Sequence, residues 1–314
     1  TATADNGSGI KDTIAFSGAV TATTFNALGA GTVTLAEDLT AALVFGTDSS
    51  TTGTVSVAAD KKIVGAITSA EAAAIGDTTE GILTFANAAT DTVLASTTIG
   101  TATHALKALN VGAATAVTGT VTGAVFATTV TTAGAGTSKF SGLVTATTIN
   151  ADGTGTLDSD AGLTAAVVFG ADGTIDMADG KIITGAVTTD TTNTGTLTFA
   201  TNTGSSFNAA STHIGATNKL LKAVNISTSA NEIEIVGNVF ATTVTATATD
   251  TTGTDTVKFN GTVNGTTLNL DGAGAFDLQG DVTAAVVISG DSTTTVAADK
   301  IIVGAVTNDG TTGT

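Results

Sequence analysis

Three aspartates have the residue type and spacing that come nearest to a chemical site. Asp152, Asp158 and Asp160 lie in the segment Asp-Gly-Thr-Gly-Thr-Leu-Asp-Ser-Asp. Carboxylate oxygens are ligands that the hard cation Ca²⁺ prefers. These residues are therefore a candidate Ca²⁺ site and the only cofactor site that the sequence suggests. The competing interpretation is a set of solvated turn carboxylates.

The spacing of acidic pairs that precede a recurring apolar block tests this candidate Ca²⁺ site. The pairs are Glu37/Asp38, Asp158/Asp160 and Asp277/Asp281, whose members are one, two and four residues apart. Metal ligands need a fixed geometry, so a changing spacing favours ordinary turn carboxylates. A second recurring set lies close to lysines and predicts turns with local charge balance. Its members are Asp60, Asp179 and Asp299.

The sequence offers few residues that could form a catalytic site. His104 and His213 lie near matching blocks, but His104 aligns with Lys219, so no histidine recurs in the repeat. A serine or threonine nucleophile needs a base held by an acid. Gly-rich turns occur without the Gly-Lys-Ser/Thr sequence of a phosphate-binding loop. We expect a protein that is not an enzyme.

Composition predicts an all-β chain. Threonine supplies 72 of the 314 residues, and Pro, Cys, Trp, Tyr and Arg are absent. Side chains branched at Cβ fit a pleated strand and lose rotamer freedom in a helix. The net charge of −17 disfavours binding to nucleic acid or to anionic lipid. The apolar runs are too short to span a bilayer, so we expect no membrane insertion by this segment.

Internal repetition is the dominant pattern of the chain. One block begins at Phe16 and reads Phe-Ser-Gly-Ala-Val-Thr-Ala-Thr-Thr. It returns in related form at Phe140, 124 residues after Phe16, and at Phe259, 119 residues after Phe140. Repeats of about 120 residues follow, with residues 1–15 ending a preceding repeat and repeats at 16–139, 140–258 and 259–314, the last one partial. Both ends of the chain fall within a repeat, which suggests a segment of a longer array.

Within the blocks the apolar residues alternate with polar ones. Leu197 and Phe199 share one face of a strand, whereas Thr196 and Thr198 share the other. Length changes between repeats fall in Thr-, Gly- and Asp-rich connections, as expected for loops between packed strands. The insertion at 69–75, followed by Gly76, predicts a short capped helical turn and the only helix.

Two all-β architectures fit these patterns. In a parallel β-helix, or β-solenoid, short strands form coils of about twenty residues that stack about 4.8 Å apart. In the alternative, each repeat is a β-sandwich, and the sandwiches are joined in tandem. Scattered phenylalanines and the absence of Pro, Trp and a distinct linker favour one continuous solenoid. No strict twenty-residue period is visible in the sequence.

Several motifs resemble a known family. The stretch Ile214-Gly-Ala-Thr-Asn-Lys-Leu-Leu-Lys-Ala-Val-Asn-Ile226 and its echo at Ile99–Val111 are similar to repeats of rickettsial-type outer-membrane protein A and B passengers. The Leu-Thr-Phe and Phe-x-Gly-x-Val-x-x-Thr-Thr blocks are similar too. The resemblance implies a surface autotransporter, whose β-solenoid passenger forms a surface layer or acts as an adhesin. It implies no catalytic residues.

These observations leave three functional hypotheses. The first is a structural segment of a bacterial extracellular surface protein, in which copies form a layer, sheath or filament by associating through solenoid ends or sides. The second is an adhesin stalk that projects a binding tip. The third is an ice-binding solenoid that presents rows of outward threonines, such as Thr32-Val-Thr34. An extracellular, cell-surface location belongs to the first two.

Overall fold

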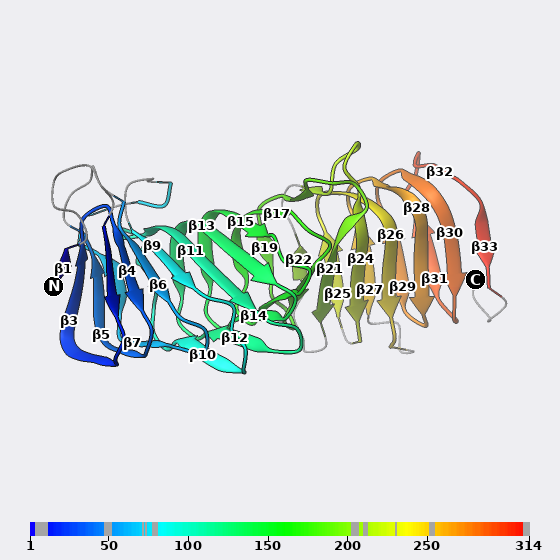
Figure 1. The fold of residues 1–314 in the computed structure, drawn as a ribbon. Helices are drawn as coiled ribbons and strands as arrows, with labels where there is room; N and C mark the ends of the chain where they lie inside the picture. The colour runs from blue at the N-terminus through cyan, green and yellow to red at the C-terminus, as the bar shows by residue number, and fades with distance from the viewer. Residues whose placement is uncertain are drawn as a thin grey trace. The chain divides into compact units, whose positions relative to one another are not determined.

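Parallel β-strands build the whole described chain. The computed structural model describes residues 1–3, 12–46, 52–70, 72, 74–76, 81–201, 207–209, 213–229, 231–250 and 255–309, with the backbone alone at 201 and 207–209. The chain divides into two compact units, Thr1–Ala165 and Ala166–Thr314. In each, neighbouring strands run in the same direction, as the arrows in Figure 1 show, and no described residue is helical. The predicted β-solenoid is confirmed, because a β-sandwich is built from antiparallel strands.

The first unit contains sixteen short or medium strands and the start of another. They are β1 (Ala2–Thr3), β2 (Thr13–Phe16), β3 (Val20–Leu28), β4 (Thr32–Leu35), β5 (Leu39–Phe45), β6 (Thr54–Val57), β7 (Ile63–Val64), β8 (Ile67–Ser69), β9 (Ile82–Phe85), β10 (Thr92–Ala95), β11 (Leu106–Ala113), β12 (Thr118–Val121), β13 (Val125–Gly134), β14 (Thr137–Phe140), β15 (Val144–Ala151), β16 (Thr156–Ser159) and β17 (Leu163–Phe169), which contains the division between the units.

The second unit continues with the same kinds of strand. They are β18 (Thr174–Met177), β19 (Ile183–Thr184), β20 (Val187–Thr189), β21 (Thr194–Thr201), β22 (Phe207–Ala209), β23 (His213–Ile214), β24 (Leu221–Thr228), β25 (Glu232–Ile235), β26 (Asn238–Ala248), β27 (Thr256–Phe259), β28 (Val263–Gly272), β29 (Ala275–Leu278), β30 (Val282–Ser289), β31 (Thr293–Val296), β32 (Ile302–Val303) and β33 (Val306–Asn308).

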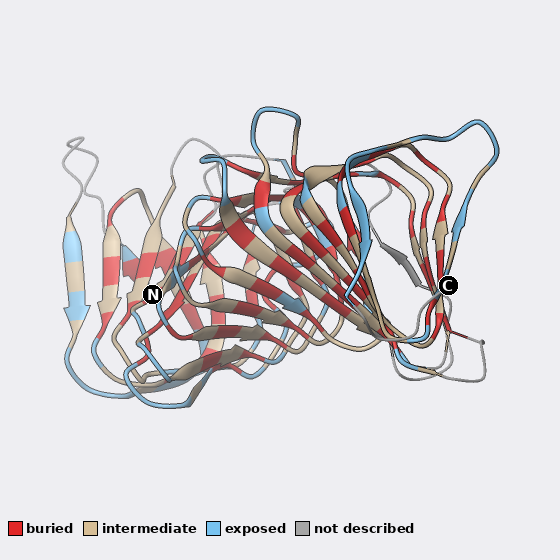
Figure 2. Ribbon diagram, turned by 90° about the vertical axis from the view of Figure 1, so that its right-hand side faces the viewer, coloured by how far each residue is buried: buried red, intermediate tan, exposed pale blue. Residues whose placement is uncertain are grey.

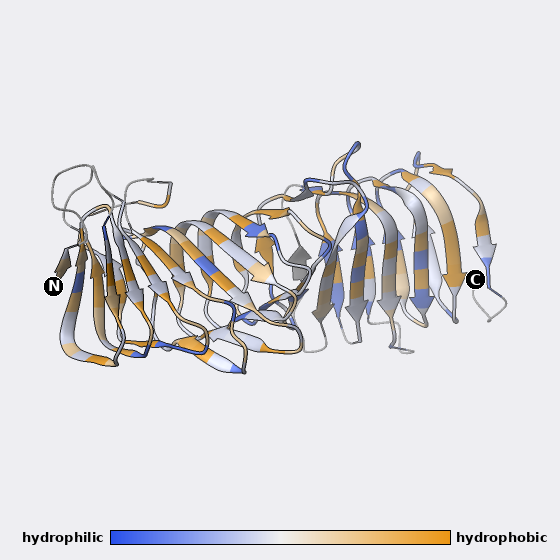
Figure 3. Cartoon of the chain, in the orientation of Figure 1, coloured by the Kyte–Doolittle hydropathy of each residue, from blue (hydrophilic) through white to orange (hydrophobic). Residues whose placement is uncertain are grey.

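The alternating sequence pattern decides which side chains form the core. In β27, Val257 and Phe259 are buried, whereas Lys258 between them is half-exposed. Leu197 and Phe199 are likewise buried with no exposed surface. Figures 2 and 3 show this as bands of buried and of apolar residues that repeat along the strands. The predicted strand faces are therefore confirmed.

The turns of the solenoid differ in length. Lys139 bonds to a residue of the next turn that lies 19 positions later, whereas the corresponding separation is 24 for Asn269 and Thr245 and 26 for Asn110 and Thr84. Loops of different lengths absorb the difference, because the paired strands must stay in register. This explains why the sequence shows no strict twenty-residue period.

The sequence repeats do not return to the same side of the coil. Val20 and Val144 occupy the same place in the repeated block. One stack of in-register residues contains Val20, Leu39, Ile63, Ala95, Val121 and Phe140. The neighbouring stack contains Phe25, Leu43, Ile67, Ile99, Val125 and Val144. One repeat therefore differs from a whole number of turns by one position around the coil.

The insertion at residues 69–75 does not form the predicted helical turn. Ser69 is the last residue of β8, and Ile75 and Gly76 lie in a hydrogen-bonded turn; Glu71 and Ala73 are outside the described residues. The prediction was wrong because alanine favours a helix only weakly over so short a span. Pairing of β8 with β5 instead holds the start of the segment extended.

Candidate functional site

The three aspartates of the candidate Ca²⁺ site lie on and beside β16. Lys139 Nζ lies 2.9 Å from Asp158 Oδ2 and 2.8 Å from Asp160 Oδ1. The hydrogen bonds to Asp160 and Asp158 raise the pKa of Lys139 above its ordinary value. Asp152 is exposed, and its backbone N–H donates to the Thr132 carbonyl. One lysine thus already forms ion pairs with two of the carboxylates, and Ca²⁺ binding there stays a prediction.

The other acidic pairs also bind groups of this chain. Glu37 forms an ion pair with Lys61 at 2.7 Å, and this contact raises the pKa of Lys61. Asp277 accepts two hydrogen bonds from the Gln279 amide, at 2.7 and 2.8 Å. These carboxylates lie on the outer surface and stabilise the stack locally.

A recurring side-chain hydrogen bond joins successive turns at a corner. Asp38 Oδ1 accepts the Lys62 N–H at 3.1 Å, and Asp281 Oδ1 accepts the Ile301 N–H at 3.2 Å. Asp38 and Asp281 hold the same place in the repeat, directly before β5 and before β30. A backbone N–H left without a partner at a corner costs free energy, so the aspartate replaces a strand bond there.

The predicted turns beside the lysines are present, and they have left-handed backbone. Asp60 and Asp299 have φ angles of 59° and 63°, and Gly180, not Asp179, holds the matching place with a φ of 67°. Asp60 Oδ1 accepts the N–H groups of Ala89 and Thr90 at 2.7 and 2.8 Å. The bond from Thr90, followed by that from Ala89, lowers the pKa of Asp60.

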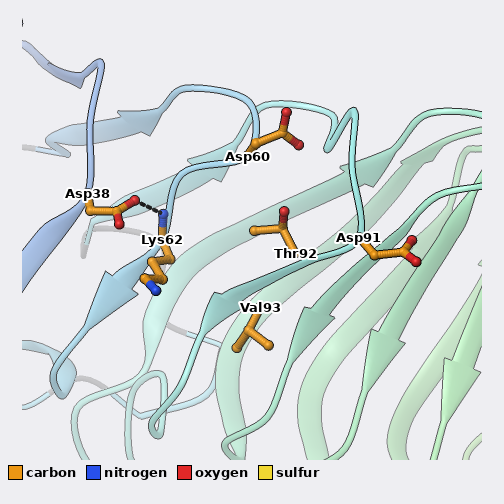
Figure 4. A pocket seen from close by; sticks show the side chains of 6 residues that line it. All are labelled: Asp38, Asp60, Lys62, Asp91, Thr92 and Val93. Carbon is orange, nitrogen blue, oxygen red and sulfur yellow. Dashed lines mark hydrogen bonds between the residues drawn. The ribbon is translucent and has the colours of Figure 1, made fainter.

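These corner residues line a shallow hollow of ≈ 340 Å³ in the first unit. Figure 4 shows its lining residues, which are Asp38, Asp60, Lys62, Asp91, Thr92 and Val93. Each aspartate directs one oxygen to a backbone N–H of a later turn, that of Asp91 to Thr118 at 2.7 Å. The carboxylates are therefore committed to connecting the turns, and no nucleophile with a base lies among the lining residues.

One of the two histidines, His104, is held by local polar groups. His104 Nδ1 lies 3.1 Å from the Thr103 hydroxyl, and its backbone N–H donates to the Thr101 hydroxyl at 3.0 Å. His213 begins β23 and is half-exposed. The described hydrogen bonds of His104 go to these threonines, and the absence of enzymatic activity stays a prediction.

Two lysines at equivalent places in the repeat each bond to a residue of a turn that is not adjacent to their own. Lys222 Nζ lies 2.7 Å from Asp172 Oδ2, across 50 residues, and this bond lowers the pKa of Asp172. Its repeat equivalent, Lys107, donates to the Thr52 hydroxyl at 3.4 Å, across 55 residues. The sequence signal was available in the repeated Leu-Lys-Ala motif, but the partner residues were not predictable from it.

Sequence reasoning missed two further features of the second unit. The first is a set of buried polar atoms without a hydrogen-bond partner, which belong to Asn231, Asp255, Ser292 and Thr294. The second is exposed apolar surface on the last turn, at Val296, Ile301, Val303 and Val306. The buried polar residues have a sequence signal, because glycine commonly stands at the equivalent place before the other short strands. The exposed apolar surface has none, because it depends on which side chains the stacked turns leave uncovered.

Over the described ranges, no group of three or more His, Asp or Glu side chains is placed to hold a metal ion. No helix there is long and apolar enough to cross a membrane. No protein-family model, no curated protein and no solved structure matches this chain.

Proposed function

We propose that this chain is a structural repeat segment of a bacterial extracellular surface protein and that copies assemble through the ends of their solenoids. A β-solenoid repeat fold fits structural material. The proposal of a surface location derives from the motifs that resemble outer-membrane protein A and B passengers. The observation that supports assembly is the exposed apolar surface and one-sided strand pairing of the last described turn.

The last described turn exposes side chains whose equivalents are covered elsewhere in the stack. Val306 of β33 is 54% exposed, whereas its repeat equivalents Ile67 and Val187 are 1% and 0% exposed. Within the described residues, β33 pairs on one side only, with β30. An apolar side chain beside an unpaired parallel edge favours the addition of another strand. At the other end, β2 pairs with β4 and has a half-exposed to exposed face.

A second copy can satisfy both edges at once. Within the described residues, the outer edge of β33 and that of β2 are different surfaces, so a contact between them in two copies is heterologous, and repeated contacts build a filament rather than a closed pair. The adhesin-stalk alternative needs no such contact. The ice-binding alternative needs uninterrupted threonine rows. Thr118, Thr137 and Thr156 form one in-register row of threonines. Two residues further along the same strands, the second and third members are followed by the charged Lys139 and Asp158. These charged residues interrupt the threonine face, which disfavours the ice-binding alternative.

Sedimentation of the purified chain over a range of concentrations, with electron microscopy of the same samples, tests the proposal. We expect concentration-dependent growth into end-to-end filaments. Val306→Lys should suppress the growth, because burying the ammonium in the contact costs free energy. Val64→Lys is the matched control, because Val64 is 36% exposed on the side of the first unit. A monomer at all concentrations, or equal loss of growth in both variants, would contradict assembly through the ends.

A further inference from the structure

The first described turn leaves three inward-facing apolar side chains partly uncovered. They are Ile14 and Phe16 of β2 and Val20 of β3, all half-exposed. Their in-register neighbours in the next turn are 2%, 1% and 0% exposed and are Val33, Leu35 and Leu39. Within the described residues, β2 pairs on one side only, with β4. This edge can therefore accept a preceding turn.

The last described turn has the three matching places. They are held by Thr294 and Val296 of β31 and by Ile302 of β32. Val296 is 38% exposed, whereas its in-register neighbour Leu278 is 0% exposed. Over the described ranges, β31 pairs with β29 alone. This edge can therefore accept a following turn, and the first described turn needs a preceding one.

The interior of the chain shows which strand precedes a turn of the β2 kind. The repeat equivalents of β2 are β14 and β27, because Phe16, Phe140 and Phe259 hold the same place in the repeat. The preceding strands are β12 and β25. They place Val121 beside Phe140 and Ile235 beside Phe259. The place beside Phe16 should therefore take a valine or isoleucine that ends a four-residue strand.

The sequence of β31 meets this requirement. It reads Thr-Thr-Thr-Val and ends at Val296, whereas β12 reads Thr-Gly-Thr-Val and ends at Val121. The two strands have the same length and differ only at the second position. In the place of β12, β31 covers Phe16 of a second copy with Val296 and Ile14 with Thr294.

The strand after β31 continues the same match. After β12, Val125 lies beside Val144, which is the repeat equivalent of Val20. After β31, Ile302 is the first residue of the next strand and corresponds to Val125. Ile302 therefore comes to lie beside Val20 of the second copy. Val306 of β33 then falls beside Phe25, before the residues of β3 that β1 already pairs.

A difference in corner length does not prevent this pairing. The corner Val296–Ile302 spans two residues more than the corner Phe16–Val20. The same difference separates two corners that lie side by side in the first unit, Val57–Ile63 and Leu35–Leu39. The strands on both sides of those corners are in register, so the stack accommodates the two extra residues.

We propose that the last described turn of one copy binds the first described turn of a second copy in a single register, with β31 parallel to β2, Val296 beside Phe16 and Ile302 beside Val20. This inference rests on the proposed assembly through the ends and adds the residues that meet there. The contact covers the half-exposed apolar side chains of both edges and pairs both strands.

Backbone hydrogen bonds of the interior define the bonds of this contact. Thr137 N–H donates to the Val117 carbonyl at 2.8 Å, and Ser141 N–H donates to the Val121 carbonyl at 2.9 Å. These two bonds join the ends of β14 to the flanks of β12. In the contact between copies, the corresponding donors are Thr13 and Ser17, and the corresponding acceptors are Ser292 and Val296.

Disulfide cross-linking of the full chain tests the register, because the chain has no cysteine of its own. Thr295 and Ala15 are exposed and lie opposite each other in the proposed pairing. Neighbouring strands are about 4.8 Å apart, which a disulfide can bridge. Chains with Thr295→Cys are mixed with chains with Ala15→Cys and oxidised. We expect covalent dimers joined through residues 295 and 15, identified by peptide mass spectrometry, and few from either variant alone.

The matched control replaces Ala15→Cys with Thr21→Cys, because Thr21 is also exposed at this edge but lies on the next strand around the coil. Its mixture with Thr295→Cys should give no more dimers than the single variants. Filaments together with dimers from the control mixture, or without dimers from the test mixture, would overturn the register and leave assembly through the ends intact. Neither filaments nor dimers would contradict both proposals.

Discussion

Lys139 Nζ lies 2.9 Å from Asp158 Oδ2, a residue 19 positions later that is its in-register neighbour in the next turn. The second unit repeats the relationship, since Lys258 is paired in register with Glu234 on one side and Asp277 on the other. Alternation of sign keeps like charges from lying directly opposite each other, which is destabilising in a sheet. Parallel stacking thus turns separate charged residues into a row with favourable contacts.

Removal of the lysine should destabilise the first unit modestly. In Lys139→Met, Asp158 and Asp160 lose their shared counter-ion, and we expect a loss of about 1 kcal/mol, since all three side chains are about one-third exposed. The measurement is urea unfolding at neutral pH. Lys181→Met is the control, because Lys181 is exposed, and its change should remain within about 0.5 kcal/mol.

The same comparison has a defined pH dependence. The pKa of Lys139 is raised above its ordinary value of 10.5 in the folded chain. Its stabilising contribution is therefore complete below that value and is lost as the pH rises through the higher, folded pKa. The stability difference between the original chain and Lys139→Met should persist to mildly alkaline pH and shrink above it. A difference that grows with pH would contradict the ion pair.

Asp60 should make the stability of the corner acid-sensitive. Its pKa is depressed below the ordinary 3.8, so its contribution is present above that value and is lost as the pH falls through the folded pKa. Asp60→Gly removes the carboxylate and keeps the left-handed turn, as Gly180 does at the equivalent place. We expect Asp60→Gly to be less stable than the original chain at pH 7 and to converge with it in acid. Thermal unfolding at both pH values measures this.

Close packing of successive turns should make one glycine irreplaceable. A Cβ at Gly155 would collide with the carbonyl oxygen of Gly136 in the previous turn, whereas a Cβ at Gly18 would meet no atom within 4 Å. Gly155→Ala should lower the free energy of unfolding by about 2–3 kcal/mol. Gly18→Ala should be close to neutral. Equal effects in denaturant unfolding would show that the turns are not packed at this distance.

The phenylalanine at the start of each repeat should contribute differently to the free energy of unfolding in the three repeats. Phe140 and Phe259 are 0% and 1% exposed, whereas Phe16 is half-buried and has one edge-to-face contact with Phe25, at a centroid distance of 5.3 Å. Phe140→Ala and Phe259→Ala should each cost about 3–5 kcal/mol. Phe16→Ala should cost about 1–2 kcal/mol, because less area leaves water there. Calorimetric unfolding of the three variants measures the order.

Much of the strand structure was predictable from local patterns. Alternation placed Leu197, Phe199 and Val257 in the core, because successive side chains of a strand point to opposite faces whatever the strand's partners are. The parallel solenoid followed from composition and from the absence of sandwich features. The helical turn at 69–75 failed, because pairing of β8 outweighed a weak local propensity.

The candidate site shows the limit of this reasoning. Asp158 and Asp160 were recognisable as an acidic pair, but Lys139 as their partner was not. In-register neighbours can be 18 residues apart, as Phe25 and Leu43 are, or 32 residues apart, as Ile63 and Ala95 are, so there is no fixed spacing to search. The same holds for the buried Asp255, whose place next to Gly274 of the following turn is set only by the register of β27 and β29.

The sequence by itself determined the face of each strand and the repeat of its blocks, because both depend on neighbours along the chain. The tertiary structure alone decided which residues stack. Loop lengths vary between turns, so the contact between Lys139 and Asp158 and the burial of Asp255 exist only once the strands are in register. The acidic pair that offered the first chemical candidate thereby became a lysine-bridged contact, and a buried acidic side chain, that of Asp255, was found inside the stack.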